Sequence, residues 1–279
     1  MAPISKRSLS TTLQARMSTS DAPSAVIEAI KLRKTFESVV AVDEVTLTVK
    51  RGQTVALLGG NGAGKTTTIS MLLGLLLPTS GEVRVLGHDL LQDRYAVLSR
   101  MNFSSPYVEL PHRLTVEQNL RVYCDLYGVQ NPKDRIRELG ERLDLTRFMD
   151  RQSGKLSAGQ KTRLALAKSL INRPEVLMLD EPTASLDPDT GDWVRSYLEQ
   201  YRAEVGASML IASHNMNEVE RLCDHVLMMR SGRIVDQGTP SELLSRYGRH
   251  TLEDVFLDIA RDRKRGPASL ELAEETTHE

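Results

Sequence analysis

Apolar and polar residues alternate along two segments of the chain with the period of two that half-exposed β-strands show. Val45, Leu47 and Val49 alternate with threonines, and Val83 and Val85 alternate with charged residues. Each pattern places its valines and leucine on one face of an extended backbone and the polar side chains on the other. The two segments therefore predict strands of an antiparallel sheet with one face buried.

Three other segments are continuously apolar, at residues 54–58, 176–179 and 209–212. Runs this short and this apolar are typical of parallel strands that are buried on both faces. A hairpin is predicted nearby, with strands at 225–229 and 233–236 joined by a Ser-Gly turn. Together these segments predict an α/β core built around a parallel sheet.

Polar residues follow two of the buried runs directly. Asp180 and Glu181 end the run at 176–179, and Ser213 and His214 end the run at 209–212. Open α/β sheets bind their ligands at the carboxyl ends of the strands. We therefore expect these four side chains to face the same ligand.

The pattern between about residues 100 and 170 is mainly helical. Thr115 and Gln118 form a capping box, and Gly128 ends the segment that follows. The apolar residues of that segment recur at helical spacing, namely Val116, Leu120, Tyr123, Cys124 and Tyr127. This pattern predicts a helical subdomain inserted into the sheet core.

Composition excludes several classes of protein. The chain has 279 residues, 40% hydrophobic and 26% charged, with a formal net charge of -1 and no clustered basic excess, so no nucleic-acid partner is expected. Two cysteines without C-x-x-C spacing predict neither a disulfide framework nor a zinc site. The most apolar stretch, 69–77, is far shorter than the roughly 20 residues that cross a bilayer.

One loop matches the phosphate-binding pattern G-x-x-x-x-G-K-[ST] at every specified position. Its residues are Gly59, Gly60, Asn61, Gly62, Ala63, Gly64, Lys65 and Thr66. The buried run at 54–58 precedes it, and a mostly apolar helix is predicted from Lys65 to Leu77. Backbone N–H groups at such a helix start converge on phosphate oxygens, while Lys65 adds a positive charge and the Thr66 hydroxyl suits Mg²⁺. The chain is therefore predicted to bind a nucleoside triphosphate.

A second helix start lies at Leu156, Ser157, Ala158, Gly159 and Gln160. Taken alone, Ser157 and Gln160 form a capping box, which has a purely structural role before an apolar helical stripe. The amides of Ala158 and Gly159 also make this helix start suitable for binding a phosphate. The two interpretations stay open on these residues alone.

Five elements follow one another along the chain: the phosphate loop, the five residues at 156–160, the run into Asp180-Glu181, Ser185-Leu186-Asp187, and His214. Their order and approximate spacing resemble those in the ATP-binding domains of ABC transporters. The resemblance covers about residues 26–240. The resemblance implies an α/β P-loop NTPase core with an antiparallel β flank and an inserted α-helical subdomain. A disordered tail at 1–25 and a C-terminal helical extension with an acidic tail at 241–279 complete the expected organisation.

The resemblance implies a role for each residue of the nucleotide site. ATP is expected to contact the phosphate loop, Thr67 and Asp180, and Phe36 stands where the family places an aromatic ring against adenine. Asp180 and Thr66 are expected to hold Mg²⁺, with Asp180 acting mostly through water. Glu181 is the candidate general base for the attacking water.

His214 corresponds to the family's switch histidine, which contacts the γ-phosphate and orients water. In the family, residues 156–160 contact ATP that is bound on the opposite subunit, and Asp187 is expected at that interface or as a helix cap before Pro188. Because each motif occurs once, the partner is expected to be a second ATP-binding subunit, most simply another copy in a C₂ dimer.

The chain departs from the family at the start of the helical subdomain. No glutamine stands in the segment from Met101 to Tyr107, where the family has one that senses Mg²⁺. Either Ser104 or Ser105 reaches the metal through water, or turnover is slow. The same region receives the membrane subunit in the family. Either partner contacts or ordinary loop residues are therefore expected at Tyr107, Val108, Leu110 and Arg113.

The leading functional interpretation is the ATP-hydrolysing subunit of an ABC transporter. Residues 251–258 resemble the C-terminal stretch of bacterial multidrug and antibiotic exporters. The subunit is then expected in the cytoplasm, peripheral on the inner face of the cell membrane, bound to integral-membrane permease subunits. The alternative is a soluble ABC-type ATPase that acts in assembly or regulation without transport.

Overall fold

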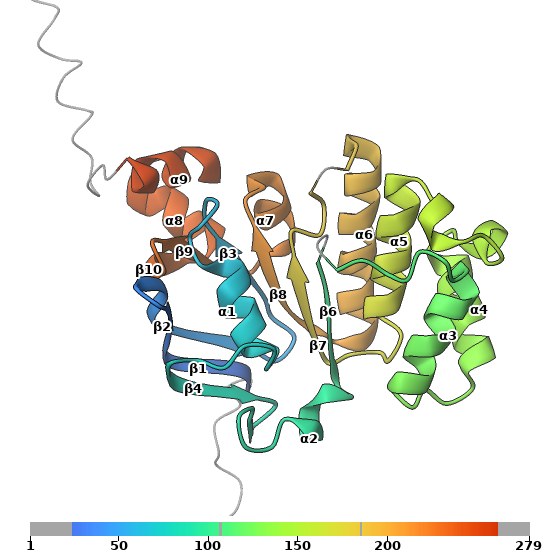
Figure 1. Cartoon of the computed structure of the whole chain (residues 1–279). Helices are drawn as coiled ribbons and strands as arrows, with labels where there is room; N and C mark the ends of the chain where they lie inside the picture. The colour runs from blue at the N-terminus through green and yellow to red at the C-terminus, as the bar shows by residue number, and fades with distance from the viewer. Residues whose placement is uncertain (1–23, 106–107, 185, 262–279) are drawn as a thin grey trace, which may run out of the picture.

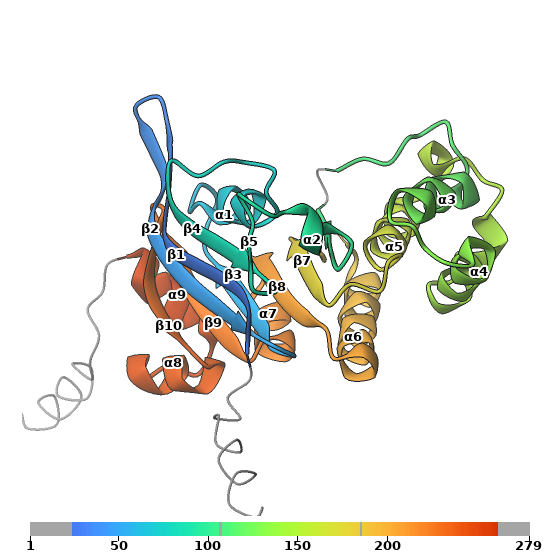
Figure 2. The same cartoon turned by 90° about the horizontal axis from the view of Figure 1, so that it is seen from below.

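The computed structural model describes residues 24–261, apart from residues 106, 107 and 185. Almost all of the expected N-terminal tail, the expected acidic tail and Tyr107 lie outside the described residues. Within the described residues, two β-sheets and a set of helices form one end of the molecule, and a helical lobe forms the other (Figures 1 and 2).

The smaller sheet is antiparallel and has the strand order β2-β1-β4-β5. Its strands are β1 (Ala25–Phe36), β2 (Val39–Lys50), β4 (Ser80–Val85) and β5 (His88–Asp89). Val45, Leu47, Val49, Val83 and Val85 are buried, while the residues between them are mostly exposed. The alternating pattern thus predicted the antiparallel flank correctly.

The larger sheet has the order β10-β9-β3-β8-β7-β6, and all its pairs are parallel except β9 with β10. Its strands are β3 (Thr54–Leu58), β6 (Met101–Ser104), β7 (Val176–Asp180), β8 (Ser208–Ser213), β9 (His225–Arg230) and β10 (Arg233–Gly238). The three strands predicted from continuous apolar runs, β3, β7 and β8, are buried along their whole length.

The helices cover this sheet and build the lobe. They are α1 (Lys65–Leu72), α2 (Tyr95–Leu98), α3 (Val116–Leu126), α4 (Pro132–Arg142), α5 (Ala158–Ser169), α6 (Pro188–Val205), α7 (Met216–Leu222), α8 (Pro240–Tyr247) and α9 (Leu252–Ala260). Short 3₁₀ turns lie at η1 (Thr146–Phe148) and η2 (Ser153–Lys155). In Figure 2, α3 and α4 lie beyond α5 and α6, away from the sheets.

Adjacent residues of a buried strand supply two separate cores. Leu57 of β3 packs with Ile69 of α1 and Val83 of β4 in the core between the two sheets. Leu58, the next residue, belongs to the core on the opposite face, together with Leu164 of α5. Because side chains alternate across a strand, a strand covered on both faces is apolar at most of its positions.

Two local expectations were wrong. The helix after the phosphate loop ends at Leu72 rather than Leu77, because Gly74 takes a left-handed backbone with φ of 69°. Leu75 and Leu77 are then 67% exposed. Residues 101–104 form β6, which pairs parallel with β7, and are not part of a helix.

The predicted hairpin is confirmed. Its turn residues, Ser231 and Gly232, have φ of 50° and 78°, and Arg233 pairs with Arg230. Positive φ at both central positions is the geometry of the tight turns that match the twist of two antiparallel strands. The capping box of Thr115 and Gln118 is also present at the start of α3.

Candidate functional site

The loop from Gly59 to Gly64 joins the carboxyl end of β3 to the first residue of α1. Gly62 and Gly64 have φ of 78° and 102°, which L side chains rarely adopt. A Cβ on Gly64 would also lie 2.7 Å from the carbonyl oxygen of Ala41 in β2. The loop is therefore compact, with its backbone at the N-terminus of α1, where the helix dipole favours an anion.

Lys65 is buried inside this loop, with a relative exposure of 6%. Its Nζ donates to the carbonyl oxygen of Gly59 at 2.7 Å and lies 3.5 Å from Oε1 of Glu181. The ammonium is thus held at the centre of the loop by groups from two strand ends. A triphosphate in the loop would meet this charge directly.

Thr66 and Asp180 form the second part of the site. The Thr66 hydroxyl donates to Oδ2 of Asp180 at 3.0 Å, and Asp180 is only 3% exposed at the end of β7. Within the described part of the chain, Oδ1 of Asp180 has no hydrogen-bond partner. Burial raises the pKa of Asp180, while the hydrogen bond from Thr66 acts against the rise. A buried carboxylate oxygen left without a donor, beside a hydroxyl, fits a hard divalent cation.

The described residues contain no group of three or more His, Cys, Asp or Glu side chains that could hold a metal ion. A cation at Thr66 and Asp180 would therefore take its remaining ligands from phosphate oxygens and water. This is the usual arrangement for Mg²⁺, which keeps several waters and one or two protein ligands.

Glu181 and His214 face each other at the ends of β7 and β8. Nδ1 of His214 lies 2.7 Å from Oε2 of Glu181, whose side chain is about nine-tenths buried. Glu181 also has φ of 50°, a left-handed backbone that costs a non-glycine residue on the order of 1 kcal/mol. The fold therefore holds this carboxylate in one direction, toward Lys65 and His214.

A buried carboxylate that the sequence interpretation missed lies behind His214. Glu218, in the first turn of α7, is fully buried, and its Oε2 accepts from the Ser213 hydroxyl at 2.5 Å. The same hydroxyl accepts from the backbone N–H of Asn215 at 3.0 Å, so the two bonds bracket His214. The N-cap pattern from Asn215 to Glu218 was visible in the sequence, but the burial of the carboxylate was not.

Residues 156–160 occupy a different place. Ser157 and Gln160 form the capping box at the start of α5, with Gln160 N donating to the Ser157 hydroxyl at 3.3 Å. Among the described residues, no hydrogen bond or ion pair joins this segment to the phosphate loop. Figures 1 and 2 show α5 away from α1, with β7 between them. Within one chain, residues 156–160 therefore lie away from the phosphate loop and away from the ends of β7 and β8.

Asp187 caps α6. Its carboxylate accepts from the Thr190 backbone N–H at 2.9 Å and from the Thr190 hydroxyl at 2.8 Å. These bonds, led by the one from the backbone N–H, lower the pKa of Asp187. The neighbouring residue 185 lies outside the described part of the chain.

Phe36 ends β1 and is 45% exposed, with Nζ of Lys34 5.0 Å from the ring centroid. The ring is thus available for stacking, on a cation or on a flat base.

The predicted residues at the start of the helical lobe lie in two places. Ser104 ends β6 opposite Leu179, the residue before Asp180. Val108 and Leu110 line a cavity of about 240 Å³ that Ala158 also lines. Arg113 lies exposed nearby, and its carbonyl accepts from Gln152.

The sequence and the fold of the chain both resemble those of known proteins. The family model described as "ABC transporter" matches residues 42–184. The chain is 36% identical over 244 residues to the "Probable multidrug ABC transporter ATP-binding protein YbhF" of Escherichia coli (strain K12), covering 85% of this chain and 42% of YbhF. It is 36% identical over 238 residues to the "Bacitracin transport ATP-binding protein BcrA" of Bacillus licheniformis, covering 84% of this chain and 76% of BcrA.

A solved structure described as "Structure of ATP binding subunit of ABC transporter" has the same fold, with a TM-score of 0.78 and 26% sequence identity. The match covers 84% of this chain and 99% of that one. The chain thus spans less than half of YbhF but most of the length of BcrA and of the solved subunit.

Proposed function

Since the chain belongs to the ATP-binding proteins of the ABC transporter family, we propose that it is the Mg²⁺-dependent ATPase subunit of an exporter. Lys65 and the loop amides bind the phosphates of ATP, and Phe36 stacks on adenine. Thr66 and Asp180 hold Mg²⁺, whose charge offsets the charge that develops on the transferred phosphoryl group. Glu181 takes a proton from the attacking water, and His214 holds Glu181 and the γ-phosphate in place.

The observation that carries the proposal is the division of the site. The phosphate loop, Asp180, Glu181 and His214 lie together, whereas the helix start at Ser157 lies apart from them in the same chain. Since a second copy of the chain can supply Ser157 and its neighbouring amides to the γ-phosphate, two chains complete two sites. Asp187 belongs to the same contact between subunits.

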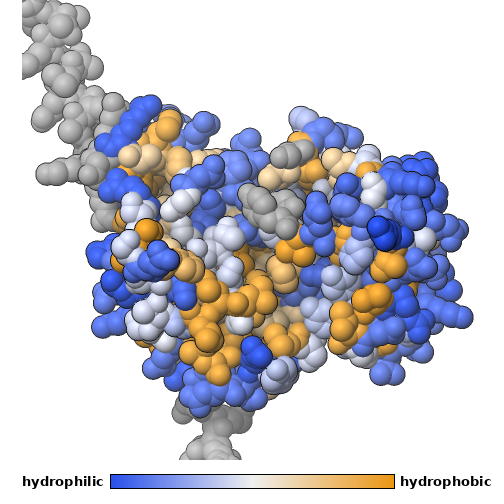
Figure 3. Space-filling view, in the orientation of Figure 1, coloured by the Kyte–Doolittle hydropathy of each residue, from blue (hydrophilic) through white to orange (hydrophobic). Residues whose placement is uncertain are grey.

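We further propose that the membrane partner binds the apolar surface beside the lobe. Leu75, Tyr95 and Leu126 are exposed and line one cavity of about 420 Å³ with Phe103. Figure 3 shows apolar side chains gathered below α1, over the segment that joins α1 to β4. An apolar cytoplasmic helix of a permease fits such a surface, because it would bury side chains that water otherwise contacts. Val108 and Leu110 extend the proposed contact.

No helix among the described residues has the length and hydropathy that a membrane crossing requires. In the proposed complex the subunit lies on the inner face of the cell membrane, bound to permease chains that form the substrate path. The names of the relatives, a multidrug protein and a bacitracin transport protein, support export over a soluble ATPase without transport.

Hydrolysis by mixed variants tests the composite site. Lys65→Ala removes phosphate binding, and Ser157→Arg blocks the helix start, so each variant alone is expected to be inactive. A mixture of the two forms heterodimers with one intact site, and is expected to recover up to about a quarter of the parent rate. Thr239→Arg is the matched control, because Thr239 forms the same capping box on α8.

The parent rate per subunit is also expected to rise with protein concentration. A rate that does not depend on concentration, or a Ser157→Arg variant that hydrolyses ATP at the parent rate, would contradict the two-subunit site. Export is tested separately by purifying the chain from detergent-solubilised membranes of its host. An integral-membrane partner should copurify with the parent and be lost on Leu75→Arg.

A further inference from the structure

Lys168 is a buried lysine at the junction of the lobe and the sheet core. It lies in the last turn of α5, the helix that begins after Ser157, and is 6% exposed. Its Nζ donates to the carbonyl oxygen of Phe103 at 3.0 Å and to Oδ1 of Asn102 at 3.3 Å, both in β6. The ammonium also lies 4.4 Å from the ring centroid of Phe103 and 5.3 Å from that of Tyr123 in α3.

No carboxylate pairs with this ammonium among the described residues, since none of their ion pairs includes Lys168. Burial lowers the pKa of Lys168 to about 8, so the side chain stays mostly charged at neutral pH. A buried charge without a counterion is costly, and two aromatic faces with two oxygen acceptors offset only part of the cost. An apolar side chain such as methionine would fill the same space without this cost.

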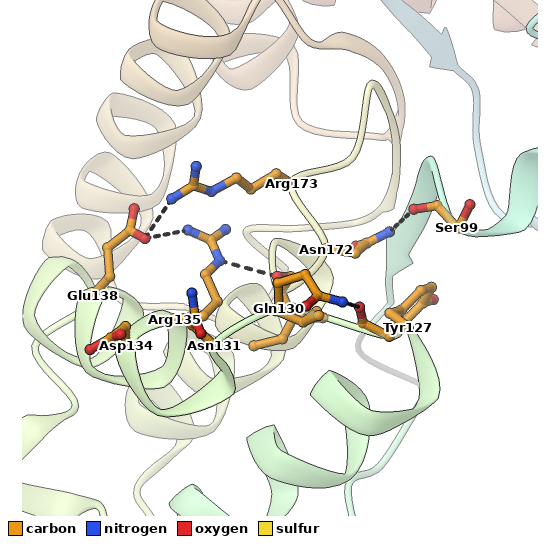
Figure 4. Close-up of a pocket in the computed structure, with 12 residues that line it drawn as sticks. Ser99, Tyr127, Gln130, Asn131, Asp134, Arg135, Glu138, Asn172 and Arg173 are labelled. Carbon is orange, nitrogen blue, oxygen red and sulfur yellow. Dashed lines mark hydrogen bonds and ion pairs between the residues drawn. The ribbon is translucent and has the colours of Figure 1, made fainter.

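The contacts of Lys168 continue through Asn102 to Asn172. Asn102, 2% exposed, donates to Oδ1 of Asn172 at 2.8 Å, and Asn172 in turn donates to the carbonyl oxygens of Ser99 at 2.9 Å and Met101 at 3.2 Å. Figure 4 shows the bond from Asn172 to Ser99. The end of α5 and the residues before and within β6 are thus joined by one set of side-chain bonds.

A second set joins the end of α5 to the lobe. Arg135 of α4, almost fully buried, donates to the carbonyl oxygen of Ile171 at 3.1 Å and also to that of Leu170. Glu138 accepts from both Arg135 and Arg173, each at 2.9 Å (Figure 4). These polar groups along the cleft of about 470 Å³ bond mainly to one another, so they serve the junction rather than a ligand in the cleft.

Lys168 and Ser157 lie at opposite ends of α5, so a small rotation of the helix at Lys168 moves Ser157 by a large distance. Ser157 lies 11 positions before Lys168, which is about 16 Å along the helix at about 1.5 Å per residue. A rotation of about 10° at Lys168 would therefore move the amides beside Ser157 by roughly 3 Å. Displacements of about 1 Å in a reacting group can cost about 100-fold in rate.

We propose that Lys168 is a positioning residue for ATP hydrolysis, because its ammonium, bound between β6 and α3, sets the angle of α5. That angle places Ser157 and its amides against ATP on the opposite subunit. The inference rests on the proposed two-subunit site. It assigns to Lys168 no contact with ATP.

Three variants test this role through separate measurements of stability, ATP binding and turnover. Lys168→Met keeps the volume and loses the charge, Lys168→Arg keeps a cation, and Lys133→Met is the matched control on the exposed surface of α4. Lys168→Met is expected to lower kcat at least tenfold, to leave the ATP affinity of the single chain within twofold, and not to lower the Tm. Lys168→Arg should recover much of the loss, and Lys133→Met should match the parent.

A Lys168→Met variant that turns over within twofold of the parent would overturn the proposal, as would a loss explained entirely by weaker ATP binding. A second measurement does not need hydrolysis. Spin labels at Arg84→Cys in β4 and Arg137→Cys in α4 report the distance between core and lobe, while Cys124 and Cys223 are buried and stay unlabelled.

The parent is expected to show one narrow distance distribution, which Lys168→Met broadens. Equal distributions in the two proteins would overturn the proposed role of Lys168. If the parent shows no turnover at any concentration, the proposed ATPase fails, while a broadened distribution in Lys168→Met still supports its role in setting the angle of α5.

Discussion

His214 and Glu181, 33 residues apart in the chain, meet at the ends of two neighbouring parallel strands, with His214 Nδ1 2.7 Å from Oε2 of the carboxylate. The other oxygen of Glu181 lies 3.5 Å from Nζ of Lys65. Both carboxylate oxygens are therefore next to a nitrogen from another element. A phosphate that draws Lys65 toward itself would leave Oε1 free to accept a proton from water.

Replacing Glu181 with glutamine tests this role. Glu181→Gln keeps the shape and the neighbours of the side chain but cannot accept a proton, so kcat is expected to fall by about 10²- to 10⁴-fold. ATP binding should persist, and an ATP-bound dimer should accumulate and be visible by size-exclusion chromatography. Glu220→Gln on α7 serves as a control with the parent rate. Unchanged turnover in Glu181→Gln would remove Glu181 from the role of base.

Removal of Mg²⁺ tests the pair formed by Thr66 and Asp180. Excess EDTA is expected to abolish hydrolysis, and readdition of Mg²⁺ should restore it. Asp180→Asn should raise the Mg²⁺ concentration needed for half-maximal turnover at least tenfold, because an amide oxygen attracts the cation less. In the absence of ATP and metal, the same variant should not be less stable, because it removes a buried charge. Equal Mg²⁺ titrations of the two proteins would contradict metal binding by Asp180.

Glu218→Gln tests whether the buried carboxylate of Glu218 affects the stability of the protein without taking part in hydrolysis. Burial raises the pKa of Glu218, and the nearby Glu181 charge raises it further, while bonds from Ser213 and Thr183 act against the rise. A carboxyl with a raised pKa in the folded state contributes stability at low pH, and this contribution is lost as pH rises through the folded value. Glu218→Gln should therefore be more stable than the parent at about pH 8 and lose that advantage at about pH 4.

Thermal melts of both proteins across this pH range measure the difference. Because the side-chain amide introduced by Glu218→Gln can still accept from the Ser213 hydroxyl, the backbone around His214 should keep its position. The kcat of this variant should therefore stay within a few-fold of the parent. A parent that is the more stable of the two at about pH 8 would show that the Glu218 charge is stabilised by contacts other than these.

The stability difference between Lys168→Met and the parent should also depend on pH. A lysine whose pKa is lowered by burial contributes stability above the unfolded value, 10.5, and loses it as pH falls through the folded value, about 8. From about pH 7 to about pH 9.5, the free energy of unfolding of the parent should rise by about 2 kcal/mol relative to Lys168→Met.

Urea unfolding at these two pH values measures the change. Burial raises the pKa of Tyr123, and because both proteins contain this residue, its own titration cancels in the difference between them. Parallel stability curves for the two proteins would mean that the ammonium of Lys168 is not buried in solution.

Local patterns predicted most of the sheet core, because a strand's pattern depends on which of its faces are covered. Alternation in β2 and β4 and continuous apolar runs in β3, β7 and β8 each matched the observed burial. The phosphate loop was equally visible, since its glycines and Lys65 are required by backbone geometry within a single short segment. The early end of α1 at Leu72 was missed because the apolar residues continue past Gly74.

The amino-acid sequence by itself determined the residue types of the site, the strands that carry them and the capping box at Ser157. Only the tertiary structure decided which of them meet: Thr66 with Asp180, Glu181 with His214, and Ser157 with neither. Only the tertiary structure revealed that Lys168 and Glu218 are buried. The reason is physical, since burial and charge pairing depend on elements far apart in the chain, whereas caps, turns and alternation depend on neighbours within a few residues.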